Sequence, residues 1–413
     1  LVQPAIDLAK NGFPVTYYIY NGIQSHYDEM MQYPSTRKMF LPYDQVPAVG
    51  DIITFPDLAE TLQRIAENGA DDFYRGLTAV KIAKSMNING GIISYNDLKN
   101  YRAKERKPIK FSYRDHEIIS MAPPSSGGVC LGQILKIVEN FPLEHYGYFS
   151  KETIHKIVEA ERFAYANRSK YLGDPDFVNN FEEHLISDKL NDSLAAEIKF
   201  NLAGSSQNVT PVAIPESEQT THFSVIDKNG LAVSNTTTLN SSYGSCFVVE
   251  STGILLNNEM DDFAVKPGVP NQFGLLGSTA NSIQPGKKML SSMTPTIVTK
   301  NDSLRYILGT PGGATIITTV AQTIINLVDF KMDLRQAVFS PRFHHQWYPD
   351  KIYFEEYSLT KDLKDGLEKM GYTFSIRGHI GDLNAIAVDN LPLQHINTNL
   401  ESKRSLSQWL QKA

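Results

Sequence analysis

The sequence predicts an α+β protein whose first half is mainly helical and whose pattern changes to that of strands after the middle of the chain. Apolar residues recur at helical spacing up to about residue 200. A connector rich in Ser, Asn, Gln and Pro then occupies residues 200–219, and alternation typical of strands begins at Thr220. The chain therefore divides into residues 1–219 and 220–413.

The helical half contains segments with apolar residues on one face at 1–12, 57–66 and 153–165. Gly12 and Gly69 follow the first two segments as stop signals. Because the first helix begins at once and without a Met, we expect residues to precede it in the natural protein, so that the first half is truncated at its N-terminus.

A strand at residues 118–122 leads into the turn Pro123-Pro124-Ser125-Ser126-Gly127-Gly128 and then into another helix. Gly-rich turns at helix starts can bind anions through backbone N–H groups. The spacing matches neither a phosphate loop nor a dinucleotide fingerprint. We therefore expect these glycines to allow close packing of the helix on the strand.

Composition restricts the class of protein. The 413 residues are 41% hydrophobic and 20% charged, which is enough for a sizeable core. The net charge of -6 favours no nucleic-acid partner, and no apolar run approaches the roughly 20 residues that span a bilayer. Cys130 and Cys246 could form at most one disulfide and identify no redox compartment.

Thr220 stands at the head of a predicted hairpin. Residues 200–219 are the kind of loop in which a chain can be cut, and Thr220 opens the strand that follows. This is the arrangement of an N-terminal nucleophile hydrolase, in which the freed α-amine serves as base for the Thr hydroxyl. Hydroxyl pairs are common at strand ends, so the pattern needs support from the rest of the chain.

The register of this hairpin has two solutions. Residues 222–226 form the first strand, a turn signal covers 227–230, and 231–239 return. With a two-residue loop Thr220 shares its face with Thr237 and Leu239, whereas a three-residue loop places it with Thr236 and Thr238. The sequence leaves both registers open.

Several sequence blocks resemble the gamma-glutamyltranspeptidase family, in family order from residue 1 to about 390. The blocks are residues 123–128, 171–175, 220–225, 238–240, 253–263, 266–271, 290–296, 309–313 and 341–347. The resemblance implies a stacked αββα sandwich of the N-terminal nucleophile hydrolase type. It also implies self-cleavage between Gln219 and Thr220, which gives a heterodimer of a large-subunit-like and a small-subunit-like fragment.

The resemblance makes Thr220 the nucleophile. Cleavage turns its amide nitrogen into an α-amine, whose pKa of about 7.7–8.0 suits a general base. The hydroxyl would attack the γ-carbonyl of glutathione or another γ-glutamyl compound and form an acyl-enzyme. Water or the amine of an amino acid or peptide acceptor would then take the glutamyl group.

The family also assigns roles around the nucleophile. Gly312 and Gly313 match the oxyanion hole, where backbone N–H groups stabilise the developing charge. Thr238, and with less support Thr236, would hold Thr220 from the adjoining strand, in agreement with the three-residue loop.

The remaining matched residues bind the glutamyl group. Asn240, Glu259 and Asp262 match positions that hold its α-amino group, and Ser291 and Ser292 match those that hold its α-carboxylate. By itself, the acidic run 259–262 would be interpreted as a solvated turn.

The histidines are interpreted as structural. Alternation places His222 on the side of Thr220, but the family assigns proton transfer to the amine. His344 and His345 have no Asp, Glu or Cys at ligand spacing, so we expect no metal site, and no cofactor is implied.

Both ends depart from the family pattern. The family's N-terminal arginine for the substrate carboxylate has no counterpart, because Arg37 lies in a loop context that does not match. The C-terminus runs into a polar tail, 391–413, with a short helix at 406–410.

Two alternatives to a γ-glutamyl hydrolase and transpeptidase therefore remain. One is an uncut, non-catalytic homologue that acts as a binding or structural protein, and the other is a related acylase or polyglutamate depolymerase. The resemblance implies a periplasmic or extracellular location, although this chain contains no signal sequence.

Overall fold

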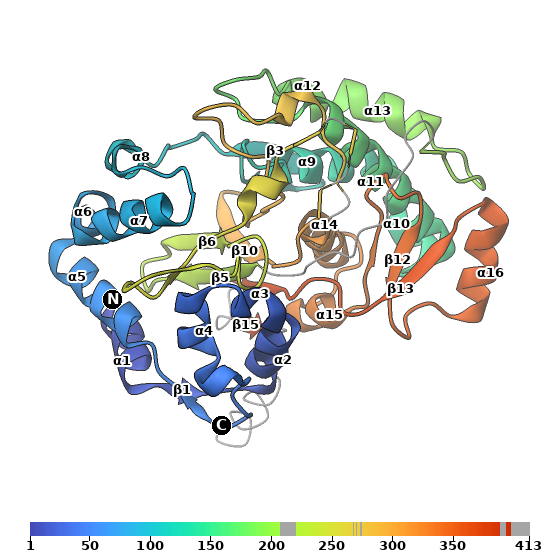
Figure 1. Ribbon diagram of the computed structural model, residues 1–413. Coiled ribbons are helices and arrows are strands. Elements are labelled where there is room, and N and C mark those ends of the chain that lie inside the picture. Colours follow the sequence, from blue (N-terminus) through green and yellow to red (C-terminus); the bar gives the residue numbers. More distant parts are fainter. Residues whose placement is uncertain (207–219, 267, 270, 273–274, 389–393, 398–413) are drawn as a thin grey trace. The chain divides into compact units, whose positions relative to one another are not determined.

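A computed structural model of the chain shows two compact units (Figure 1). It describes residues 1–206, 220–266, 268–269, 271–272 and 275–388, and the backbone of 394–397. The smaller unit comprises Leu1–Glu105 and Leu239–Asn258, and the larger comprises Arg106–Thr238 and Glu259–Ala413. These units are not the two predicted cleavage fragments, so the division at Thr220 stays a prediction.

The smaller unit is mainly helical, as the sequence predicts for this part of the chain. Its helices are α1 (Gln3–Asn11), α2 (Tyr17–Ser25), α3 (Tyr27–Met31), α4 (Pro34–Phe40), η1 (Pro42–Asp44), α5 (Pro56–Asn68), α6 (Ala70–Arg75), α7 (Leu77–Ile88) and α8 (Tyr95–Asn100). Its strands form two pairs, β1 (Phe13–Pro14) with β2 (Ile52–Ile53) and β7 (Val248–Val249) with β8 (Ile254–Leu255). Gly12 and Gly69 end α1 and α5, which confirms both predicted stops.

Side-chain hydrogen bonds join the two sequence segments of the smaller unit. Ser35 donates to the carbonyl of Val248 over 2.6 Å, and Thr36 donates to that of Cys246 over 2.8 Å. Both serve as anchors from α4. The expected loop around Arg37 is wrong: Pro34 starts a helix there, because a Pro at the first helical position loses no hydrogen bond, and Arg37 pairs with Asp44 at the surface.

A six-stranded antiparallel sheet organises the larger unit, in the order β15-β14-β10-β9-β4-β3. Its strands are β3 (Ile109–Tyr113), β4 (His116–Ser120), β9 (Thr296–Lys300), β10 (Ser303–Gly309), β14 (Asn384–Ala387) and β15 (Gln394–Asn397). A second, three-stranded sheet contains β11 (Phe343–His344), β12 (Ile352–Glu355) and β13 (Phe374–Arg377). Strands from both halves of the sequence therefore share the larger sheet.

Helices cover one face of the six-stranded sheet. The helices of this unit are α9 (Gly127–Val138), α10 (Leu143–Tyr146), α11 (Lys151–Tyr171), α12 (Glu182–Leu185), α13 (Asp188–Glu197), η2 (Glu259–Asp262), η3 (Thr279–Asn281), α14 (Thr315–Val328), α15 (Leu334–Phe339) and α16 (Lys361–Met370). Every residue of α9 and α14 is buried, because these helices lie between the sheet and further helices. They account for much of the main hydrophobic core.

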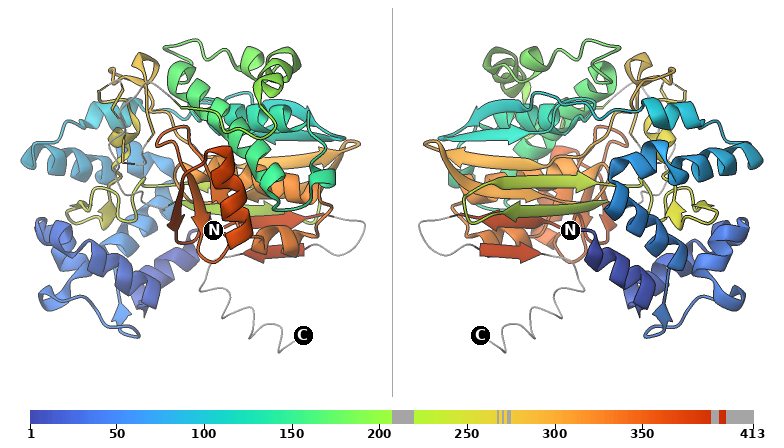
Figure 2. Two further views of the ribbon diagram at one scale, coloured as in Figure 1. Left: turned by 90° about the vertical axis from the view of Figure 1, so that its right-hand side faces the viewer. Right: turned by 90° about the vertical axis from the view of Figure 1, so that its left-hand side faces the viewer.

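The hairpin of β5 (Thr221–Ile226) and β6 (Ala232–Thr237) forms a second β layer. It packs against β10 and β14, and the right-hand view of Figure 2 shows it in front of the six-stranded sheet. The described part of this unit thus has the layers α, β and β. The predicted α+β class is confirmed.

The register of the hairpin follows the three-residue loop. Thr221 pairs with Thr237 and His222 with Thr236, while the N–H of Asp227 bonds to the carbonyl of Leu231 over 3.0 Å. The loop ends at a glycine with positive φ, as a three-residue hairpin loop requires. Continuation of the ladder sets Thr220 opposite Thr238.

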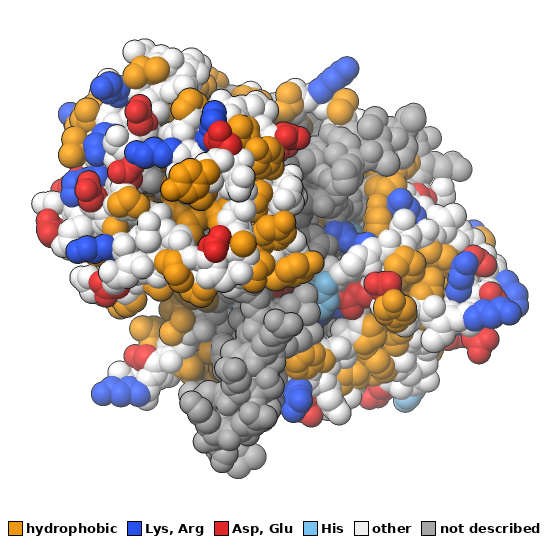
Figure 3. Space-filling view, turned by 60° about the horizontal axis from the view of Figure 1, so that its bottom comes forward, with side chains coloured by type: hydrophobic (Ala, Val, Ile, Leu, Met, Phe, Trp, Pro, Cys, Tyr) orange, Lys and Arg blue, Asp and Glu red, His pale blue; other side chains and the backbone are white. Residues whose placement is uncertain are grey.

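The remaining expectations concern the surface and the ends. No helix among the described residues is long and apolar enough to cross a membrane, and both cysteines are free. On the face drawn in Figure 3, basic side chains are mixed with acidic and hydrophobic ones rather than gathered together. The predicted helix at 406–410 and most of the predicted connector lie outside the described residues.

Candidate active site

Thr220 lies at the entrance to β5, and its side chain is held by the neighbouring strand. Its hydroxyl donates to that of Thr238 over 3.4 Å, and the side chain is half-buried. The structure thus brings together the predicted nucleophile and its predicted support. Gln219, the other side of the predicted cleavage site, lies outside the described residues.

His222 lies on the same face as Thr220 but is fully occupied. Its Nδ1 is 2.8 Å from the hydroxyl of Thr236, and its Nε2 is 3.2 Å from that of Ser224. Burial lowers the pKa of the imidazole to about 4, so it is neutral at neutral pH. Its ring packs on Gly309, where a side chain would overlap it, so this histidine spaces β5 from the end of β10.

Gly312 and Gly313 form the turn between β10 and α14. Both have positive φ, 136° and 54°, which glycine adopts without strain. The carbonyl of Gly312 accepts bonds from the backbone and the hydroxyl of Thr315 at 3.0 and 2.8 Å. Within the described part of the chain neither glycine N–H has an acceptor, so both are available to an oxyanion.

Glu259 and Asp262 place two carboxyl groups on the single-turn helix η2. Burial raises the pKa of each carboxyl to about 7, and for Asp262 the charges of Glu259 and Asp261 raise it further while Arg168 opposes the rise. A solvated turn would not shift these values. An arriving ammonium group would stabilise both carboxylates, which suits the predicted role.

Ser291 and Ser292 are buried against the turn that precedes α9. Ser126 donates its backbone N–H to the carbonyl of Ser291 over 2.9 Å, and Ser291 donates to the carbonyl of Pro124 over 3.0 Å. A side chain at Gly127 would overlap the backbone of Met293. The glycines of this turn therefore allow close packing, as expected, and the turn also fixes the two serines.

Sequence reasoning missed Arg168. This α11 residue is only 4% exposed, and its guanidinium donates to the hydroxyls of Ser126 at 2.9 Å and Ser292 at 3.2 Å. A signal was available, because Arg168 lies three residues before the family block 171–175, and an Arg inside a buried helix needs a partner.

Asn240 belongs to the smaller unit. It has a left-handed backbone, with φ 74°, is buried, and lies with its amide 3.4 Å from the carbonyl of Asn258. Its predicted contact with the substrate amino group stays a prediction.

The His344-His345 pair is buried and hydrogen-bonded inside the larger unit. His344 contacts Thr318 at 2.9 Å and Gln346 at 2.8 Å. His345 lies 3.2 Å from Asp350, a carboxylate five residues later that the sequence interpretation overlooked. No group of three His, Cys, Asp or Glu side chains in the described ranges could hold a metal ion.

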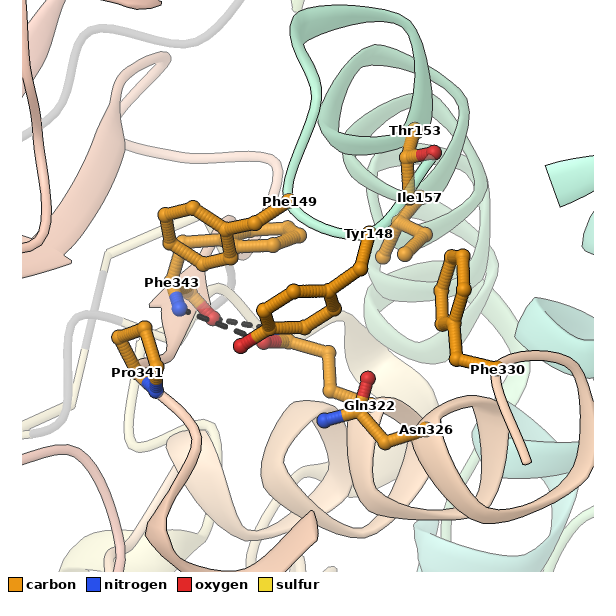
Figure 4. A pocket seen from close by; sticks show the side chains of 9 residues that line it. All are labelled: Tyr148, Phe149, Thr153, Ile157, Gln322, Asn326, Phe330, Pro341 and Phe343. Atoms are coloured by element: carbon orange, nitrogen blue, oxygen red, sulfur yellow. Dashed lines mark hydrogen bonds between the residues drawn. The ribbon is translucent and has the colours of Figure 1, made fainter. Parts of the chain in front are cut away.

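The larger unit also contains a small cavity away from the predicted site residues, and aromatic side chains line much of it (Figure 4). Gln322 lines it and bonds to the carbonyl and N–H of Phe343 at 2.6 and 3.3 Å. Tyr148, Phe149 and Phe330 line the rest. None of the predicted site residues borders this cavity.

Comparison with known proteins identifies the family. The sequence pattern described as gamma-glutamyltranspeptidase matches residues 1–405. The chain belongs to the gamma-glutamyltranspeptidase family. It is 43% identical to the glutathione hydrolase proenzyme of Escherichia coli (strain K12), over 94% of this chain and 67% of that protein.

Further relatives support the assignment to the gamma-glutamyltranspeptidase family. The glutathione hydrolase proenzyme of Pseudomonas sp. (strain A14) is 42% identical over 91% of this chain and 66% of its own length. Among solved structures, cephalosporin acylase from Bacillus halodurans superposes with a TM-score of 0.82 at 26% identity, over 95% of this chain and 70% of that one. The chain thus spans about two thirds of the length of such relatives, and it belongs to a family of enzymes.

Proposed function

We propose that this chain is part of an autoprocessing γ-glutamyl hydrolase and transpeptidase. Cleavage before Thr220 frees its α-amine, which takes the proton of the Thr220 hydroxyl as the oxygen attacks the γ-carbonyl of the substrate. The bond to the leaving amine then breaks, and the glutamyl group stays on Thr220 as an ester. Water or a second amine resolves this ester.

The observation that carries the proposal is the contact between the hydroxyls of Thr220 and Thr238 at the head of β5. β-Branching restricts Thr220 to few rotamers, and Thr238 supports the one that is present. The free N–H groups of Gly312 and Gly313 follow β10, whose last residue packs on the strand that Thr220 opens. This arrangement suits acyl transfer.

The substrate class follows from charge. Glu259 and Asp262 suit an ammonium group, and Ser291 and Ser292 suit a carboxylate, so the two ends of an α-amino acid would be bound separately. Relatives named glutathione hydrolase favour glutathione and similar γ-glutamyl compounds as donors. We further propose amino acid or peptide acceptors and a periplasmic or extracellular location.

Turnover of γ-glutamyl 4-nitroanilide tests the proposal. The unchanged protein should release nitroaniline, and Thr220→Ala should reduce the rate by at least about a thousandfold, because it removes the nucleophile. Thr221→Ala, an exposed neighbour on the opposite face, is the matched control and should keep most of the activity. Equal activity in Thr220→Ala and the unchanged protein would refute the nucleophile.

An acylase is the second candidate, because the structural relative from Bacillus halodurans carries that name. A glutaryl anilide, which lacks the α-amino group, separates the two. The carboxylates Glu259 and Asp262 predict a preference for the γ-glutamyl anilide. Faster turnover of the glutaryl compound would favour the acylase.

A further inference from the structure

Arg168 is a buried cation without an ion-pair partner. No Asp or Glu oxygen among the described residues lies within ion-pair distance of its guanidinium. Its two side-chain contacts are the hydroxyls of Ser126 and Ser292. Burying a guanidinium costs several kcal/mol unless charge and hydrogen bonds compensate. The arrangement therefore calls for a negative group that the described protein residues do not supply at contact distance.

The direction of the protons at the two serines is set by Arg168. An arginine can only donate hydrogen bonds, so both serine oxygens act as acceptors toward it. The hydroxyl of Ser126 donates its own hydrogen bond to the carbonyl of Ser291, over 2.7 Å. Ser292 has no protein acceptor for its proton within the described ranges. Its hydroxyl is thus left to donate to something else.

Positive potential gathers at this position from two sources. Arg168 is the first, and the second is the start of α9, which Ser126 precedes and which carries the partial positive charge of a helix N-terminus. Asp262 lies close enough for its charge to act on Arg168, and thus marks the opposite, ammonium-binding end. The serines therefore lie at the positive end of a short dipole.

We infer that Arg168 is a positioning residue for the carboxylate end of the substrate: it turns the hydroxyl of Ser292 toward the α-carboxylate and supplies the compensating positive charge behind it. The inference rests on the proposed γ-glutamyl substrate. It assigns Arg168 a part in substrate selection and no part in the proton transfers at Thr220. The carboxylate would in turn relieve the buried guanidinium.

The test compares two anilides that differ only in the α-carboxylate, γ-glutamyl 4-nitroanilide and 4-aminobutyryl 4-nitroanilide. Arg168→Met and Arg168→Lys should raise KM for the first by about tenfold or more, with kcat within about threefold. KM for the second should change by less than about threefold. Lys keeps the charge but not the fork, so its effect should be the smaller. Arg114→Lys, at the Asp329 ion pair, is the control and should leave both KM values unchanged.

Equal rises in KM for both anilides, or none for either, would overturn the inference and leave the proposed function intact. If the unchanged protein turns over neither anilide, calorimetric titration with L-glutamate replaces kinetics. Binding that Arg168→Met weakens about tenfold or more supports the inference. Binding that it leaves unchanged, or no binding to the unchanged protein, overturns it.

If Arg168→Met does not fold, Ser126→Ala tests the inference in its place. This change removes one of the two acceptors of Arg168 and leaves Ser292 in place. It should also raise KM for the γ-glutamyl anilide selectively, by a smaller factor than Arg168→Met. A loss that is equal for the two anilides would make Arg168 a purely structural residue.

Discussion

Burial raises the pKa of the two carboxyl groups of η2, and this shift affects how they would bind a substrate. Asp262 and Glu259 each have a pKa of about 7, so near neutral pH each is only partly ionised. An ammonium group favours the ionised forms, and proton uptake competes with its binding. Recognition of the amino group should therefore strengthen as the pH rises through about 7.

Inhibition by L-glutamate at different pH values tests this. As the pH falls from about 7 to about 6, the inhibition constant should rise by up to about tenfold for each carboxylate that must be ionised. Asp262→Asn should weaken inhibition and flatten its pH dependence. Glutarate, which lacks the amino group, is the control ligand and should show no such dependence. A flat profile for L-glutamate would contradict the assigned role.

The packing of Gly309 on His222 gives a second prediction. The added methyl of Gly309→Ala would overlap the imidazole, and displacing this buried ring should cost about 1–3 kcal/mol of unfolding free energy. Because the ring spaces β5 from β10, turnover should fall as well. Thermal unfolding and the anilide assay measure both effects.

Gly378→Ala is the matched control for Gly309→Ala. Gly378 is exposed, has no positive φ, and has open space where the methyl group would lie. We expect a stability change within about 0.5 kcal/mol. Should Gly309→Ala prove as mild as this control, the close contact with His222 would be wrong.

Residues of the site were predictable to different degrees. Thr220 and Thr238 could be paired from strand alternation plus one choice of loop length, since strand periodicity is local. The sequence could point to Arg168 but not to its partners, because Ser126 and Ser292 are 42 and 124 residues away and meet it only through tertiary packing. Arg37 was expected in a loop, but Pro34 starts the helix α4 that contains it.

At the scale of elements, α11 joins residues 204–206, which precede Thr220, to the chain just before β12. The Arg162 cluster consists of Glu159, Arg162, Ser206 and Asp350. Ser206 donates its backbone N–H to Asp350 over 2.7 Å, and Gly204 donates to Glu159 over 3.1 Å. The cluster therefore ties residues 204–206 to a part of the chain about 150 residues later.

Removal of the central cation should be costly. Arg162→Met leaves Glu159 as a buried, unpaired carboxylate, so we expect a loss of about 3–5 kcal/mol in unfolding free energy. Lys364→Met, which removes an exposed helix pair with Glu368, should cost less than about 1 kcal/mol. Urea unfolding measures the loss of stability in both variants. Equal unfolding midpoints for Arg162→Met and Lys364→Met would mean that the Arg162 cluster adds no stability.

The sheets explain why cleavage would not separate the fragments. β3 and β4 lie before Thr220, whereas β9, β10, β14 and β15 lie after it, and β4 pairs with β9 inside one sheet. Arg162 and Asp350 make an ion pair across the same division. The two fragments should therefore stay together as a heterodimer under native conditions.

For the whole molecule, the sequence predicted the helical first half, the strands after Thr220 and the α+β class, because hydrophobic periodicity is a local signal. It did not predict that Leu239–Asn258 joins the smaller unit, since that depends on long-range contacts such as Thr36 with Cys246. The predicted division into cleavage fragments therefore differs from the division into compact units.

Intact mass and N-terminal sequencing of the purified protein, after incubation at neutral pH, test the central claim most directly. We predict two masses under denaturing conditions, one from a fragment that begins Thr-Thr-His-Phe, and one joint species in native gel filtration. Thr220→Ala should remain a single chain. A folded protein that stays uncut over days would contradict self-cleavage and leave the non-catalytic homologue as the better account of this chain.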